Sequence, residues 1–368
     1  MNLRTRLAAL ACAASLGLTG LSLAPMAQAT IRPAISVAAI EGYCPADVEV
    51  AAVEWVASLW ENKKDAFTAG FTAESVFALA AVGAEEGLID ELLAHLRTLA
   101  PKYTENPGGA AKLAIALQAM GEDPENFAGL DLVKIMQDAL AKDPTAEGIY
   151  NLPYVVIALV REGVEVPDAA VKALLESQDA SGAWGFQDWQ DKTKFVADAD
   201  TTGAVLMALA GLEEVAKEAK ATDDQAAVKA AAAKGIAWLS STRNAKGYWD
   251  GYSPVNTTAM VLMGLRAWDK DEAETKAFDY LLKAQEQAGG KGFPNSPTGT
   301  EPELYATVQA IQGLSDMTLL NLEWAMAECA DVETSATPTA SATATPTAGA
   351  STSTSTKPTP GTMPKTGN

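Results

Sequence analysis

The chain has 368 residues, of which 48% are hydrophobic and 20% are charged, and its formal net charge at pH 7 is −20. The acidic excess excludes nucleic acid as a partner, because a protein that binds a phosphate backbone needs a cationic face. It is compatible with an extracellular protein that attracts neutral or cationic ligands. The length suffices for one large core or two ordinary domains.

Residues 1–29 have the pattern of a secretory signal peptide. Arg4 and Arg6 precede an apolar run over residues 7–23, and Ala27-Gln28-Ala29 is a small-x-small site of the kind that signal peptidase cuts. Gly, Ser and Thr dilute the run, which disfavours a membrane anchor. We therefore expect an extracellular protein that is secreted or displayed on a bacterial cell surface.

Between residues 30 and 333 the sequence repeats a pair of helices, one amphipathic and one almost entirely apolar. The six amphipathic segments are 47–60, 86–100, 130–141, 167–178, 225–241 and 274–285. The six apolar segments are centred on Leu79, Leu117, Leu159, Leu209, Leu265 and Ile311, which are 38 to 56 residues apart. No segment shows the alternation of a β-strand. The repeats predict an all-α fold, and their number favours an α6/α6 toroid, with an inner and an outer ring of helices, over an open solenoid.

The cysteines support a closed ring. After removal of the signal peptide only Cys44 and Cys329 remain, near opposite ends of the folded region. Two cysteines in an oxidising compartment are more often bridged than free, so we predict a disulfide between them. The single histidine, His95, lies in an amphipathic segment, and no cluster of Cys and His exists to hold zinc, so we predict no metal site.

Residues 334–368 consist mainly of Thr, Ser, Ala, Pro and Gly. Such a segment has too little apolar surface to offset the entropy lost on ordering, which predicts a disordered stalk. Its end, Met363-Pro364-Lys365-Thr366-Gly367, resembles the sortase signal LPxTG with Met in place of Leu, but no apolar helix or basic tail follows it. Attachment to the cell wall, truncation of the sequence and release all remain open.

Three loops that precede apolar helices resemble one another. Residues 178–186 read QDASGAWGF, residues 243–249 read RNAKGYW and residues 285–293 read QEQAGGKGF. These loops resemble the QW-type repeats of the squalene cyclase and prenyltransferase α/α-toroid superfamily, most clearly over residues 172–314. The resemblance implies that Trp184 and Trp249 lock neighbouring hairpins together, with a place at the mouth of the barrel as the alternative.

Directly after the first of these loops comes Asp198-Ala199-Asp200-Thr201-Thr202. By resemblance to the DxDTT motif of class II terpene cyclases, Asp200 would be a catalytic general acid and Asp198 its neighbour, whose charge raises the pKa of Asp200. Aromatic residues are only 7% of the chain, which is few for a cavity that shelters carbocations. The alternative is that one of the two carboxylates caps the helix that follows.

A second resemblance, to the α-domain of cobalamin carriers of the transcobalamin and intrinsic factor type, fits an exported protein better. It concerns the helix start Asp200-Thr201-Thr202-Gly203, and it implies a large ligand held where the inner helices begin. Those carriers have a second domain that closes over the ligand, so a separate lid domain or an uptake transporter would be the partner here.

Our first hypothesis is therefore a monomeric, non-enzymatic protein that binds a small organic ligand, such as a corrinoid, at the mouth of the barrel. A class II cyclase-like enzyme and a cell-wall scaffold or adhesin are the alternatives. Polar and aromatic side chains near the starts of the inner helices form the candidate ligand site. They are Tyr150, Asn151, Trp184, Asp198, Asp200, Thr201, Trp249, Tyr252, Asn256, Glu303 and Tyr305.

Overall fold

The structure, a computed structural model, describes residues 45–188 and 190–324. Within these residues the chain forms twelve α-helices, two short 3-10 helices (Lys64–Ala66 and Asp271–Ala273) and one two-stranded sheet. The predicted helical class is confirmed. The predicted signal peptide, the stalk and the Cys44–Cys329 disulfide lie outside the described residues.

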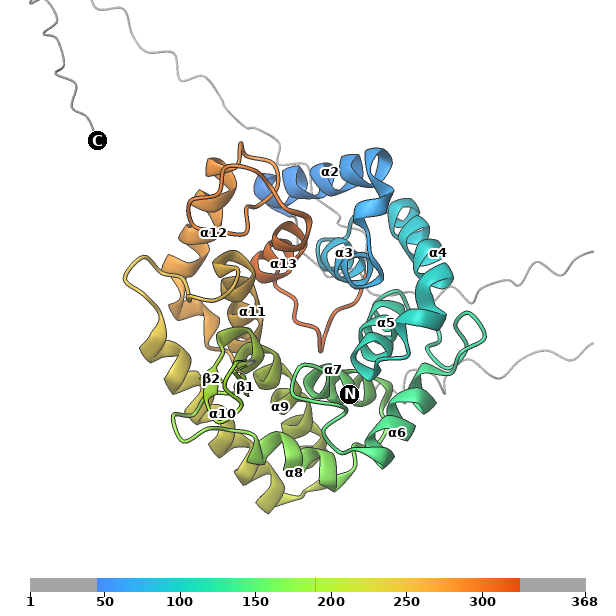
Figure 1. Ribbon diagram of the computed structural model, residues 1–368, viewed down its shortest axis with the longest axis vertical. Coiled ribbons are helices and arrows are strands. Elements are labelled where there is room, and N and C mark those ends of the chain that lie inside the picture. Colours follow the sequence, from blue (N-terminus) through green and yellow to red (C-terminus); the bar gives the residue numbers. More distant parts are fainter. Residues whose placement is uncertain (1–44, 189, 325–368) are drawn as a thin grey trace, which may run out of the picture. The chain divides into compact units, whose positions relative to one another are not determined.

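Six largely buried helices form an inner layer. They are α3 (Ala69–Ala81), α5 (Pro107–Ala119), α7 (Leu152–Glu162), α9 (Ala199–Ala219), α11 (Pro254–Arg266) and α13 (Leu304–Leu314). Each packs against the next, and α13 packs against α3, so the contacts of the inner layer run in a closed circle (Figure 1). The circle requires close approach of backbones. A Cβ added at Gly203 of α9 would lie 2.6 Å from the carbonyl oxygen of Met260 on α11.

Six amphipathic helices surround the inner layer (Figure 1). They are α2 (Asp47–Asn62), α4 (Glu86–Tyr103), α6 (Leu132–Lys142), α8 (Asp168–Glu176), α10 (Thr222–Thr242) and α12 (Thr275–Gln287), and their ends lie within three residues of the predicted ones. Each buries one stripe against the inner layer. In α6 the stripe consists of Leu132, Val133, Met136 and Leu140. None of the described helices is both long and apolar enough to span a membrane.

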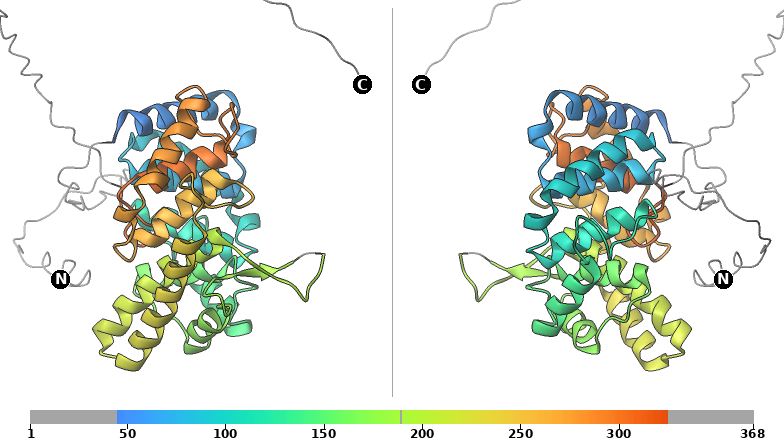
Figure 2. Two further views of the ribbon diagram at one scale, coloured as in Figure 1. Left: turned by 90° about the vertical axis from the view of Figure 1, so that its left-hand side faces the viewer. Right: turned by 90° about the vertical axis from the view of Figure 1, so that its right-hand side faces the viewer.

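The one sheet was not expected from the sequence. Strands β1 (Gly185–Gln187) and β2 (Phe195–Ala197) pair antiparallel with Phe186 opposite Val196, and they form a hairpin that projects from the helices (Figure 2). Gly185 permits this pairing, since a Cβ there would lie 1.9 Å from the carbonyl oxygen of Val196. Strands of three residues are too short for an alternating pattern to be visible in a sequence, so the prediction of no strands was wrong.

Residues 315–324 cross the end of the inner layer where the inner helices finish, and we call them the closing segment. Arg161, near the end of α7, donates hydrogen bonds to the carbonyl oxygens of Leu319, Leu320 and Leu322 at 3.0, 2.9 and 2.7 Å. Trp324 donates its backbone N–H to the carbonyl oxygen of Ala119, the last residue of α5, and its indole N–H to that of Ala84 in the loop after α3. The closing segment therefore satisfies backbone groups at this end of the circle.

Candidate functional site

All six inner helices begin at the same end of the circle, because each follows an outer helix and leads into the next one (Figures 1 and 2). The residues that precede them are all polar, and we call the surface that they define the N-terminal face: Thr68, Asn106, Asn151, Asp198, Ser253 and Glu303. In four of the six helices this side chain accepts a hydrogen bond from the first turn. The positive ends of six helix dipoles converge here, which suits hydrogen-bond acceptors and anions.

Asp198 caps α9. Its Oδ2 atom accepts a hydrogen bond from the backbone N–H of Thr201 at 2.8 Å and another from the Thr201 hydroxyl. The capping role that the sequence left open therefore belongs to Asp198, and it also occupies the hydroxyl of buried Thr201. Glu303 caps α13 in the same way, through the backbone N–H of Ala306 at 2.9 Å.

Asp200 is the second residue of α9 and has a different environment. Its Oδ2 atom accepts a hydrogen bond from the hydroxyl of Thr257 on α11 at 3.2 Å, whereas its Oδ1 atom is buried without a partner among the described residues. Burial and, secondarily, the charge of Asp198 raise the pKa of Asp200 to about 7. Asp200 is therefore poised between its charged and neutral forms at neutral pH.

Asn256 lies on α11, in the first turn of the neighbouring inner helix. Its Oδ1 atom accepts a hydrogen bond from Ser253, but its Nδ2 atom is buried and has no partner within the described part of the chain. The N-terminal face thus contains an unsatisfied acceptor on α9 and an unsatisfied donor on α11.

Tyrosines stand beside these polar groups. Tyr150 precedes α7, has 58% of its surface exposed and packs its ring 5.4 Å from that of Phe186 in the projecting hairpin. Tyr252 precedes α11 and is fully exposed. Tyr305, by contrast, stacks on Phe71 at 5.3 Å, and Asn151 donates to the carbonyl oxygen of Ala146. Tyr150 and Tyr252 therefore offer free ring surface at the N-terminal face.

Trp184 and Trp249 do not belong to this face, which corrects their assignment to the ligand site. Both side chains are buried, at 0% and 1% exposure, and their indole N–H groups donate to the carbonyl oxygens of Leu174 and Leu239 at 2.9 and 2.8 Å. Each indole thus reaches back to the preceding outer helix. They therefore hold each loop against the outer helix of its own hairpin.

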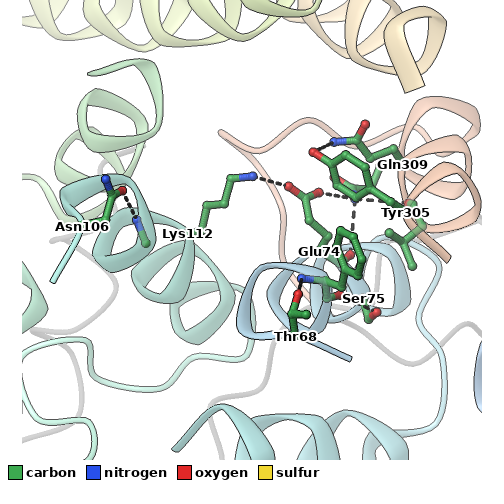
Figure 3. Close-up of polar contacts among 11 residues, drawn as sticks. Thr68, Glu74, Ser75, Asn106, Lys112, Tyr305 and Gln309 are labelled. Atoms are coloured by element: carbon green, nitrogen blue, oxygen red, sulfur yellow. Dashed lines mark hydrogen bonds and ion pairs between the residues drawn. The ribbon is translucent and has the colours of Figure 1, made fainter. Parts of the chain in front are cut away.

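A polar cluster that was not predicted from the sequence lies inside the circle. Lys112 on α5 lies 2.6 Å from Glu74 on α3 (Figure 3). Its ammonium lies 4.4 Å from the ring centre of Tyr154 on α7. The sequence does contain a pattern that predicts this contact. Glu74 and Lys112 are each the single charged residue of an apolar helix, and they are 38 residues apart. The same spacing separates the first two repeats, Leu79 and Leu117.

The fold and site together describe a protein of paired helices whose inner helices begin at a polar, acidic face. No known protein family and no curated protein matches the sequence. Among solved structures, the chain is similar to the crystal structure of haptocorrin in complex with Cbi, with a TM-score of 0.56 and 12% identity. The match covers 76% of this chain and 69% of haptocorrin. At this identity the similarity shows a common fold.

Proposed function

We propose that the chain is a secreted or surface-displayed binding protein that holds a corrinoid, or a nutrient of similar size and polarity, on its N-terminal face. The observation that carries this proposal is the pair of unpartnered buried atoms, Asp200 Oδ1 and Asn256 Nδ2, in the first turns of adjacent helices. A buried polar atom without a partner costs about 1–3 kcal/mol. A ligand that displaces the groups covering these atoms and bonds to both recovers that cost on binding.

The chemistry of the face suits a large polar ligand with flat surfaces. A primary amide offers both N–H donors and a carbonyl acceptor, and a corrinoid carries several such groups around its ring. The exposed rings of Tyr150 and Tyr252 offer apolar surfaces on which a flat ligand can stack. The similarity to haptocorrin, which was crystallised with Cbi, also supports a corrinoid.

The open N-terminal face implies a partner that covers the ligand. We propose that a separate lid domain or an uptake transporter takes this role, and that the chain itself acts as a monomer. The projecting hairpin stands beside Tyr150 at this face, so it is well placed to contact such a partner.

Thermal unfolding of the mature chain in the presence of cyanocobalamin, dicyanocobinamide and farnesyl diphosphate tests the proposal. A ligand at one hundred times its Kd adds about 2.7 kcal/mol to the free energy of unfolding, which raises Tm by about 2 °C or more in a protein of this size. We expect the corrinoids to raise Tm, and the double variant Asp200→Ala/Asn256→Ala to reduce the shift.

Asp131→Asn is the matched control for changes on this face. Asp131 caps outer helix α6 through Lys134 N at 2.8 Å, at the opposite end of the molecule. Its substitution should leave the corrinoid shift intact. The absence of any corrinoid shift in the wild type would contradict the proposal and favour the scaffold.

A second candidate, a cyclase-like enzyme, is supported by the pKa of about 7 at Asp200. A carboxylic acid that keeps its proton near neutral pH can protonate an alkene. In this case a prenyl diphosphate would be consumed, and Asp200→Asn would abolish its turnover without unfolding the protein. Product analysis by mass spectrometry separates this candidate from a binding protein.

A further inference from the structure

The ion pair between Glu74 and Lys112 lies below the N-terminal face. Each is the sixth residue of its helix, which places both about one and a half turns from the helix starts. Figure 3 shows the two side chains extending toward one another from α3 and α5. A buried ion pair is seldom more stable than the apolar residues that could replace it, so its presence points to a role other than stability.

The two partners are not equivalent. Glu74 has 2% of its side chain exposed, and its two carboxylate oxygens accept hydrogen bonds from Lys112 at 2.6 Å and from Gln312 at 3.1 Å. Lys112 has 18% of its side chain exposed and, among the described residues, uses only one of its three N–H donors. Lys112 is therefore the more exposed partner of the pair, and its ammonium has N–H donors to spare.

Two phenols adjoin this ion pair. Tyr154 lies beneath the Lys112 ammonium, at 4.4 Å from the ring centre, and Figure 3 shows Tyr305 beside Glu74. The Tyr305 hydroxyl accepts a hydrogen bond from Gln309 at 2.8 Å, which leaves its own hydrogen available to a ligand. Burial raises the pKa of Tyr154 to about 12 and also raises that of Tyr305, so both remain hydrogen-bond donors at neutral pH.

We infer that Lys112, Tyr154 and Tyr305 form a subsite for an anionic group, either a phosphate or a carboxylate, inside the circle of inner helices. An ammonium and two hydroxyl donors match the acceptor oxygens of such a group. The pair of Glu74 and Lys112 is neutral as a whole, so the subsite would hold the anion through directed N–H and O–H donors and not through net charge. Asp200 is partly protonated at neutral pH because of its raised pKa.

Calorimetric titration of the mature chain with inorganic phosphate, at constant ionic strength, tests for the subsite. We expect saturable binding that Tyr305→Phe weakens at least fivefold, since this change removes one donor and keeps the ring that stacks on Phe71. The double variant Glu74→Gln/Lys112→Gln should abolish binding, and it leaves no unpaired buried charge. Lys134→Gln is the matched control, because Lys134 pairs with Asp138 on the surface of α6 and should not affect binding.

A second arm distinguishes a free anion from an anionic substituent of a larger ligand. Cyanocobalamin carries a phosphodiester that dicyanocobinamide lacks, so binding of that group at Lys112 predicts that the double variant loses affinity for cyanocobalamin only. The inference is overturned if neither phosphate nor cyanocobalamin responds to the double variant while circular dichroism shows it folded. Binding of phosphate without binding of any corrinoid would support the subsite and contradict the proposed function.

Discussion

Gln285 on α12 donates a hydrogen bond from Nε2 to the carbonyl oxygen of Val48 on α2, at 2.6 Å. The same amide nitrogen donates to the carbonyl oxygen of Lys291 in its own loop at 2.7 Å. Gln178 makes the equivalent pair of bonds, to Gly182 in its loop and to Ala231 on α10, the next outer helix. At Gln285 the neighbouring outer helix is the first one of the described chain, so this bond joins the last hairpin to the first.

We predict that Gln285→Ala lowers the free energy of unfolding by about 2–3 kcal/mol. Gln285 is 2% exposed, and its removal leaves two carbonyl oxygens without their donor. Urea unfolding followed by circular dichroism measures the change. Gln287→Ala is the control, because Gln287 bonds to Gly299 in an exposed position, and its loss should cost less than about 0.5 kcal/mol. Equal effects of the two variants would contradict a closing role for Gln285.

The second prediction concerns the pH dependence of stability. The pKa of Asp200 rises from 3.8 to about 7 on folding, so its ionisation is harder in the folded state. The contribution of Asp200 to the free energy of unfolding is therefore lost as the pH rises from about 4 to about 7. By pH 7 the total decrease amounts to up to about 4 kcal/mol. Asp200→Asn should be more stable than the wild type at pH 8 and similar to it near pH 4.

Asp198→Asn is the informative companion variant. Asparagine still caps a helix, but its substitution removes the negative charge that contributes to the raised pKa of Asp200. In Asp198→Asn the free energy of unfolding should therefore depend less on pH than in the wild type, without a large decrease at pH 5. Urea midpoints measured at pH 4, 5, 6, 7 and 8 check both variants. Parallel curves for the wild type and Asp200→Asn would show that Asp200 does not titrate in this range.

The sequence predicted the helices well because the inner ones are buried on nearly every side. A helix such as α5 must then be almost uniformly apolar, while α6 needs only one apolar stripe. A cap at this helix start was also accessible from sequence, since Asp is a common N-cap, but the choice between Asp198 and Asp200 required the structure, in which α9 begins at Ala199. These features depend on neighbours in the chain.

Features that depend on distant parts of the chain were harder to predict. Trp184 faces the core because its indole donates a hydrogen bond to the carbonyl oxygen of Leu174. The loop sequence alone does not show that this carbonyl lies within reach. The partnership of Glu74 and Lys112 depends on two parallel helices lying side by side with equal register. Glu74 and Lys112 occupy the same position in consecutive repeats, so aligning the single charged residues of the apolar helices would have predicted that they lie side by side.

The last prediction concerns Arg161, which holds the closing segment. Its guanidinium donates to three carbonyl oxygens of that segment and, through Nε, to Gln118 at 3.1 Å. Burial lowers its pKa to about 10, so it stays charged at neutral pH. Arg161→Met removes all four bonds and should lower the free energy of unfolding by about 3 kcal/mol or more.

Arg161→Lys separates charge from geometry. A lysine keeps the charge, but one compact ammonium cannot reproduce the planar fork that spans Leu319, Leu320 and Leu322. We therefore expect an intermediate loss of stability, together with faster proteolysis within residues 315–324, detected by mass spectrometry of the fragments. Lys102→Arg, at an exposed ion pair with Glu105, should change neither quantity. If Arg161→Lys were as stable and as protease-resistant as the wild type, its charge alone, and not the directed bonds to the closing segment, would hold this end of the circle together.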